Sequence, residues 1–136
     1  MGENQHFAGS YTEEYVNNAT PVQLIVILYD TAIRSCEDAR GCMERNDVSG
    51  LNQAIDKCNS VISELQASLN LKDGGEIASS LNNLYDYMKA NMLRAGAEQN
   101  FDLIAEVYRL LENLRSAWRR IDSDVKPDIL TGGDQK

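Results

Sequence analysis

Apolar residues recur every three or four positions through most of this chain, which is the spacing of one face of an α-helix. The first stripe contains Ile25, Leu28, Ala32, Cys36, Ala39 and Met43. Thr20 can cap this helix, Pro21 suits its first position, and Gln23 completes a capping box with Thr20. The pattern therefore predicts a helix over 21–45, which the polar segment 45–50 ends.

Three more stripes of the same spacing follow. A helix over 51–71 is predicted from Leu51, Ile55, Cys58, Ile62, Leu65 and Leu69. A helix over 75–96, with Asp73 as its cap and Gly96 as its stop, is predicted from Ile77, Leu81, Leu84, Met88, Met92 and Ala95. A helix over 101–121 is predicted from Ile104, Val107, Leu111, Leu114, Trp118 and Ile121.

Four helices joined by short loops predict an all-α fold, an antiparallel up-down four-helix bundle over 20–121. Residues 1–19 form a leader, helical or extended, ahead of the bundle. Residues 122–136 contain proline, glycine and charge without an apolar period, so we expect a mobile, disordered tail.

The first and last predicted helices carry more apolar residues than one stripe needs. A second stripe on the first helix, offset by about 100°, consists of Val22, Val26, Tyr29 and Ile33. On the last helix, Leu103 and Leu110 flank the main stripe. Two interpretations stay open: the wide core of a small bundle, or a groove for an amphipathic partner helix that the leader covers as a removable lid.

Composition argues against some classes of partner and favours one cellular compartment. The 136 residues carry a net charge of −8, which repels nucleic acid and anionic membrane surfaces. No apolar run approaches the roughly 20 residues of a membrane span, so we expect a cytoplasmic protein without membrane insertion. The three cysteines show no metal-binding spacing; Cys36 and Cys58 fall on core stripes as free thiols, whereas Cys42 lies off the stripe.

Residues that carry chemistry are scarce. The single histidine, His6, lies in the leader, which argues against a dinuclear carboxylate site or a phosphotransfer histidine in a bundle helix. The acidic residues do not interrupt the core stripes and are typical of solvated helix faces. We therefore expect no catalytic residues, no metal and no cofactor, and the protein is not expected to be an enzyme.

Four segments, in order, resemble the flagellin-specific export chaperones of the FliS family. They are "YTEEYVNNATPVQLIVILYDTAI" from Tyr11, "AIDKCNSVISELQASLNL" from Ala54, "GGEIASSLNNLYDYM" from Gly74 and "LIAEVYRLLENLRSAWRRI" from Leu103. The resemblance covers roughly 11–121. One departure is Thr31, where the family often has glycine, and it affects local packing alone.

The resemblance implies a bundle that acts in the bacterial cytosol during flagellum biogenesis. Such a chaperone binds the disordered C-terminal region of newly made flagellin, prevents premature polymerisation and keeps flagellin competent for type III export. By the resemblance and by helical phase, the lid residues are Tyr11, Tyr15 and Val16, and the flagellin-binding residues are Val22, Val26, Tyr29, Ile33, Leu103 and Leu110. Other flagellar export or regulatory proteins are further candidate partners.

An alternative function belongs to another class. The same apolar faces would serve a structural homo-oligomer, a homodimer being the simplest case, or an adaptor.

Overall fold

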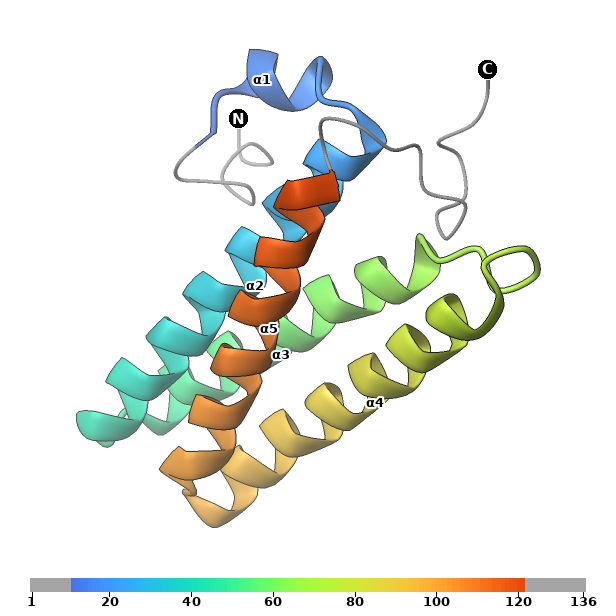
Figure 1. The fold of residues 1–136 in the computed structure, drawn as a ribbon. Coiled ribbons are helices and arrows are strands. Elements are labelled where there is room, and N and C mark those ends of the chain that lie inside the picture. Colours follow the sequence, from blue (N-terminus) through green and yellow to red (C-terminus); the bar gives the residue numbers. More distant parts are fainter. Residues whose placement is uncertain (1–10, 122–136) are drawn as a thin grey trace.

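The computed structural model describes residues 11–121, so the predictions for 1–10 and 122–136 lie outside the described residues. The described part is built from helices, as the sequence predicts (Figure 1). They are α1 (Glu13–Asn17), α2 (Pro21–Glu44), α3 (Val48–Ala67), α4 (Gly75–Glu98) and α5 (Phe101–Ile121). The all-α fold class is therefore confirmed.

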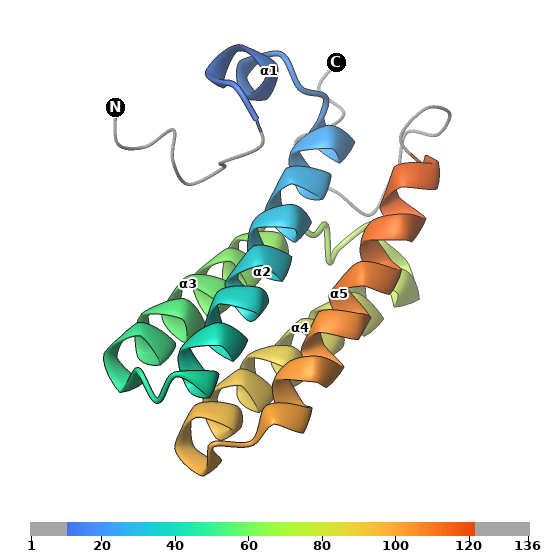
Figure 2. The ribbon, with the colours of Figure 1, turned by 90° about the vertical axis from the view of Figure 1, so that its left-hand side faces the viewer.

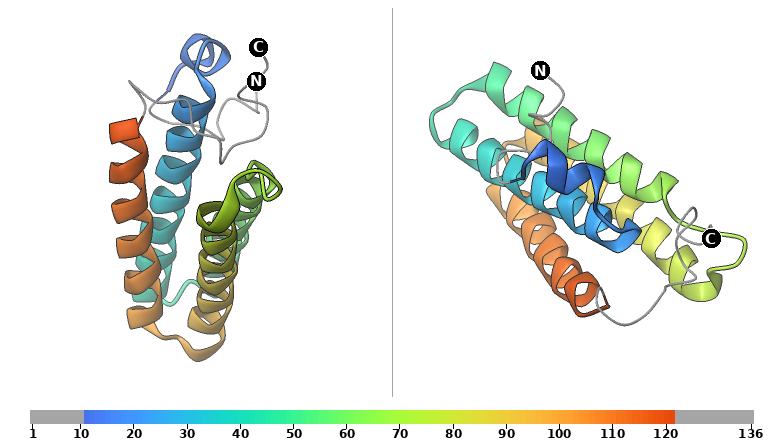
Figure 3. Two further views of the ribbon diagram at one scale, coloured as in Figure 1. Left: turned by 45° about the vertical axis from the view of Figure 1, so that its right-hand side comes forward. Right: turned by 90° about the horizontal axis from the view of Figure 1, so that it is seen from above.

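The four long helices form a ring in which each packs on two others. α2 contacts α3 and α5, and α4 contacts the same two helices. The chain reverses direction from each long helix to the next, and α2 with α5 forms one layer over a second layer of α3 and α4 (Figures 1 and 3). The short helix α1 lies across the beginning of α2 (Figure 3).

The start of α2 follows the sequence prediction. The backbone N–H of Gln23 donates to Thr20 Oγ1 at 3.1 Å, and the backbone N–H of Thr20 donates to Gln23 Oε1 at 3.0 Å. These two bonds complete the predicted capping box, with Pro21 in the first turn. α3 starts three residues earlier than predicted because Asp47 caps it, accepting the backbone N–H of Gly50 at 2.9 Å.

Two predicted signals of α4 were wrong. Asp73 does not cap the helix, since Gly74 holds the capping position without a side-chain hydrogen bond. Gly96 does not end it either, because α4 continues to Glu98 and Gln99 adopts the left-handed conformation there, with φ 54°. Gly96 instead allows a close approach of α3, since a Cβ atom at this position would lie 2.8 Å from Ile55 Cδ1.

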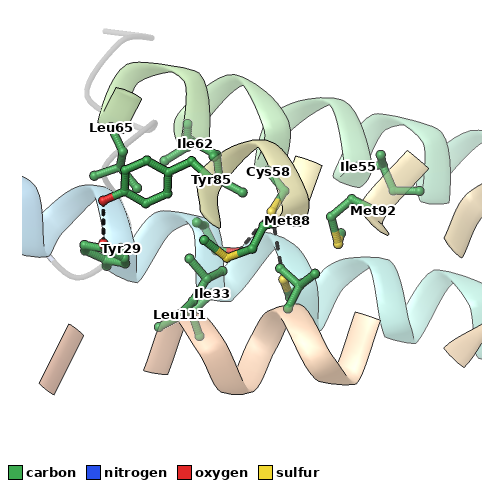
Figure 4. Close-up of a cluster of buried hydrophobic side chains, with 14 of the residues drawn as sticks. Tyr29, Ile33, Ile55, Cys58, Ile62, Leu65, Tyr85, Met88, Met92 and Leu111 are labelled. Carbon is green, nitrogen blue, oxygen red and sulfur yellow. Dashed lines mark hydrogen bonds between the residues drawn. The ribbon is translucent and has the colours of Figure 1, made fainter. Parts of the chain in front are cut away.

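The core contains a polar cluster among apolar side chains. The hydroxyl oxygens of Tyr29 and Tyr85 lie 2.6 Å apart, and either hydroxyl can donate (Figure 4). The indole N–H of Trp118 donates to Tyr29 Oη at 3.2 Å. All three side chains are buried, so α2, α4 and α5 are joined by hydrogen bonds inside the bundle.

The cysteines are free and buried. Cys36 and Cys58 lie on core stripes as predicted, with their sulfur atoms 3.9 Å apart across α2 and α3. The contact with Cys36 and burial raise the pKa of the Cys58 thiol well above its usual value. Cys42, which the spacing left ambiguous, is buried near the end of α2.

Candidate partner-binding surface

The leader contributes one short helix, α1, whose residues are largely exposed. Thr12 caps α1 by accepting the backbone N–H of Tyr15 at 3.0 Å. None of the residues of α1 is buried, although Val16 is half-buried, and an isolated helix of this length is unstable in water. The ring of Tyr15 is exposed and stacks on that of Tyr11, with centroids 5.2 Å apart. These three aromatic and apolar residues are those predicted as the lid.

The leader is fastened to the bundle at Asp30 of α2. The hydroxyl of Tyr11 donates to Asp30 Oδ2. The other carboxylate oxygen, Oδ1, accepts from Arg115 Nη1 of α5 at 2.6 Å, and Arg119 Nη2 lies 3.7 Å from it. Asp30 is 15% exposed, so one half-buried carboxylate joins the leader, α2 and α5. We call these four residues the Asp30 cluster.

The environment of Tyr11 keeps it a hydrogen-bond donor. Burial raises its pKa to about 12, and the hydrogen bond to Asp30 and the negative charge of that residue act in the same direction. The phenol is therefore protonated at neutral pH. Sequence spacing did not reveal the Asp30 cluster, because Asp30 and Arg115 are 85 positions apart and belong to different helices.

The predicted partner stripe on α2 lies largely inside the bundle. Val22, Tyr29 and Ile33 are buried, and Val26 is half-buried. Tyr29 is covered by Tyr85 and Trp118 from within the bundle. This burial favours the wide-core interpretation for the three buried residues, while their contact with a partner stays a prediction.

The predicted residues on α5 are more accessible. Leu103 and Leu110 are half-buried and pack against the edge of the core. Leu114 and Ile121 have the same partial burial further along the helix. α5 therefore offers a row of partly accessible apolar side chains.

An uncovered apolar face lies on the first half of α4. Ile77, predicted as a core residue, is 61% exposed, so that prediction was wrong. Leu81 and Leu84, the next members of the same stripe, are half-buried. We call these three residues the uncovered α4 face. They line a shallow hollow of about 350 Å³ together with Glu76 and Ser80.

A second hollow, of about 400 Å³, lies between the end of α2 and the start of α3. Its lining mixes polar residues such as Glu37, Arg45 and Gln53 with small residues such as Gly41 and Ala54. Among residues 11–121, no group of three or more histidine, cysteine or acidic side chains is placed to hold a metal ion. No helix within this range is long and apolar enough to cross a membrane.

Comparison with known proteins identifies the family. A family model described as "Flagellar protein FliS" matches residues 3–125. The chain belongs to the FliS family. Among relatives, the flagellar secretion chaperone FliS of Salmonella typhimurium is 38% identical over 116 residues, which are 85% of this chain and 86% of the relative. The FliS of Bacillus subtilis is 30% identical over 125 residues, 91% of this chain and 92% of the relative.

The names of these FliS relatives describe a secretion chaperone, which is a role without catalysis. Family membership supports a chaperone role in flagellar export for this chain. In this FliS-family chain, apolar side chains are accessible on the uncovered α4 face and along the row on α5, and the leader is held at the Asp30 cluster.

Proposed function

We propose that this FliS-family chain acts in the cytosol and binds the disordered C-terminal region of newly made flagellin. Binding prevents premature polymerisation and keeps flagellin competent for type III export. The observation that carries the proposal is the uncovered α4 face, where residues with the spacing of a core stripe are open to solvent.

The size of this face fits one amphipathic helix. Ile77, Leu81 and Leu84 extend over two helical turns, about 10 Å along α4. A client helix with apolar residues at i, i+3 or i+4, and i+7 can bury them against such a face. A flagellin segment bound in this way gains order only on the chaperone, and its apolar side is withheld from other flagellin molecules.

The half-buried residues Val26, Leu103 and Leu110 extend the proposed contact beyond α4. Val22, Tyr29 and Ile33 are buried, so flagellin reaches them only where packed side chains move aside. Tyr11, Tyr15 and Val16 form the lid, and the bond of Tyr11 to Asp30 supports a closed position when no client is present.

Calorimetry tests the proposal. The full chain is titrated with a peptide of the flagellin C-terminal region encoded in the same genome, at several temperatures. We expect one-to-one binding with a negative change in heat capacity, because apolar surface is buried. An absence of binding at every temperature, together with self-association of the chaperone at rising concentration, would favour the homo-oligomer instead.

A matched pair of variants on α4 locates the contact. Ile77→Asp places a charge on the uncovered α4 face, whereas Leu93→Asp places one at an equally exposed apolar residue, 60% against 61%. We expect Ile77→Asp to weaken flagellin binding at least about tenfold, since a buried apolar contact is lost and a charge is desolvated. Leu93→Asp is expected to bind within twofold of the unmodified chain, and equal losses in both variants would contradict this site.

Removal of residues 1–18 tests the lid. The truncated chain is expected to associate with the flagellin peptide faster, because the part of the proposed surface beside Asp30 no longer waits for the leader to leave. A lower association rate and a lower affinity would make the leader part of the binding surface.

A further inference from the structure

The Asp30 cluster places a chemical requirement on whatever replaces the leader. Asp30 is 15% exposed, and each of its carboxylate oxygens has a donor. Arg115 donates to Oδ1, with Arg119 close to the same atom. Oδ2 accepts from Tyr11, so removal of the leader takes away the donor of this oxygen.

A client that covers Asp30 without supplying a donor would bury a charged oxygen that lacks a hydrogen bond. Leaving a buried charged acceptor unpaired costs about tenfold or more in affinity. Both guanidinium groups approach Oδ1, whereas the donor to Oδ2 is Tyr11 of the leader. An entirely apolar client segment is therefore a poor replacement for Tyr11.

The charges around Asp30 also restrict the type of donor. One carboxylate lies against two guanidinium groups, from Arg115 and Arg119. These guanidiniums disfavour another cation, and the carboxylate disfavours an acidic group beside it. In the same cluster, Arg115 Nε is buried and has no acceptor among residues 11–121. A neutral group that donates to Asp30 and can also accept a hydrogen bond avoids both repulsions and also offers an acceptor in this cluster.

We propose that the client segment which displaces the leader carries an amide or hydroxyl side chain, and that this side chain takes the place of the Tyr11 hydroxyl on Asp30 Oδ2. This inference rests on the proposed function. It makes Asp30 a specificity determinant for the client, and Tyr11 an internal stand-in for a client residue. An asparagine or glutamine offers both kinds of group, since its nitrogen can donate to Asp30 and its oxygen can accept a hydrogen bond.

A double-mutant cycle between chaperone and peptide tests this assignment. In the flagellin C-terminal peptide, each amide or hydroxyl residue is replaced in turn by an apolar residue of similar shape, Asn→Leu, Gln→Met, Thr→Val, Ser→Ala or Tyr→Phe. Affinities are measured by calorimetry with the full unmodified chain and with Asp30→Ala. We expect one peptide position to lose about tenfold in affinity for the unmodified chain and less than twofold for Asp30→Ala.

Two further chaperone variants serve as controls. They show whether a change in affinity comes from misfolding or from a changed position of the leader. Tyr11→Phe frees the leader but keeps Asp30, so the tenfold loss at that peptide position is expected to persist. Asp30→Asn keeps the shape of the side chain without its charge, and the loss is expected to fall to about threefold. Circular dichroism checks that each variant retains its helix content.

The outcomes separate this inference from the proposed function. If the unmodified chain does not bind the peptide, the proposed function fails. If it binds, but no peptide position shows a loss that depends on Asp30, the proposed function stands and the side-chain assignment is overturned.

Discussion

The two halves of α4 carry one continuous apolar stripe but have different surroundings. In the second half, Met88, Met92 and Ala95 are fully buried. In the first half, Ile77 is exposed, and Leu81 and Leu84 are half-buried. The buried residues of the first half are Ala78 and Tyr85, each one position after a member of the stripe, so in this half the apolar spacing did not predict which side of the helix faces its neighbours.

Hydrogen bonds and ion pairs show which helices hold each part of α4 and α5. The second half of α5 is tied to α2, since Arg115 bonds Asp30 and Trp118 bonds Tyr29. The first half of α4 is tied to α3, where Gln66 Nε2 donates to Asn82 Oδ1 at 3.0 Å, and to α2, where the hydroxyl oxygens of Tyr85 and Tyr29 lie 2.6 Å apart.

Bonds between α4 and α5 occur further along α4. The hydroxyl of Tyr87 donates to Glu106 Oε2 at 2.6 Å, and Asn91 Nδ2 donates to Glu106 Oε1 at 3.5 Å. The side chains of Ile77, Leu81 and Leu84 precede these bonds in the helix. α5 lies beside α2 (Figure 2), and the two helices are bonded near the end of α5.

Introducing a charge into each half gives the largest expected contrast. Met92→Asp buries a carboxylate among apolar side chains and is expected to lower the free energy of unfolding by about 4 kcal/mol or more. Ile77→Asp is expected to change it by less than about 0.5 kcal/mol, because the new charge stays in water. Urea unfolding followed by circular dichroism measures both, and similar losses would show that the first half is covered in solution.

Truncation to alanine tests the same contrast without adding charge. Met88→Ala leaves a cavity in the core and is expected to cost about 2–5 kcal/mol of unfolding free energy. Leu84→Ala is expected to cost about 1 kcal/mol, since its side chain is already half in solvent. Urea unfolding measures both free energies. A larger loss for Leu84→Ala than for Met88→Ala would contradict the difference in burial between the two halves of α4.

High pH is expected to act on Tyr29, which is buried against Tyr85 near the middle of α4. Burial raises the pKa of Tyr29 to about 12 from 10.0, so the folded state holds this proton more tightly than the unfolded state. The stabilisation is complete below pH 10 and is lost as the pH rises through 12. From pH 9 to 11, Tyr29 is expected to remove about 1 kcal/mol of unfolding free energy.

Urea unfolding at pH 9, 10 and 11 measures this dependence, with Tyr29→Phe for comparison. The variant is less stable at neutral pH because it lacks the bonds to Tyr85 and Trp118, but its stability is expected to fall less steeply with pH. An unchanged slope would mean that Tyr29 does not contribute to the pH dependence.

The smallest expected effect concerns α1. Tyr11→Phe removes the bond to Asp30, yet α1 can then detach and water can solvate the carboxylate. Since no residue of α1 is buried, the loss of unfolding free energy is expected to stay below about 1 kcal/mol. Thermal unfolding measures it, and a loss as large as that of Met88→Ala would show that α1 belongs to the core.

Much of the fold could be predicted because helical spacing and capping are local properties. Thr20, Pro21 and Gln23 lie within four positions of each other and marked the start of α2 correctly. The end of α4 was misplaced because a glycine in a helix can serve a neighbouring helix as well as a turn, as Gly96 does for Ile55.

The candidate surface was harder to predict, because it depends on contacts between distant segments. Val22, Tyr29 and Ile33 were assigned to a groove from helical phase, yet phase cannot show that Tyr85 and Trp118 cover Tyr29. Helical phase also predicted Ile77 as a core residue, although its side chain is exposed. The Asp30 cluster depends on three segments meeting, which no single stretch of sequence indicates.

The contact between Cys36 and Cys58 allows the separation of α2 from α3 to be measured in the unmodified chain. Both sulfur atoms are sealed between α2 and α3, and the raised pKa of Cys58 keeps the less reactive thiol form. An alkylating reagent can therefore reach Cys58 only when these helices separate. The rate of alkylation at this residue, followed by peptide mass spectrometry, records how often the α2–α3 interface opens without any substitution in the protein.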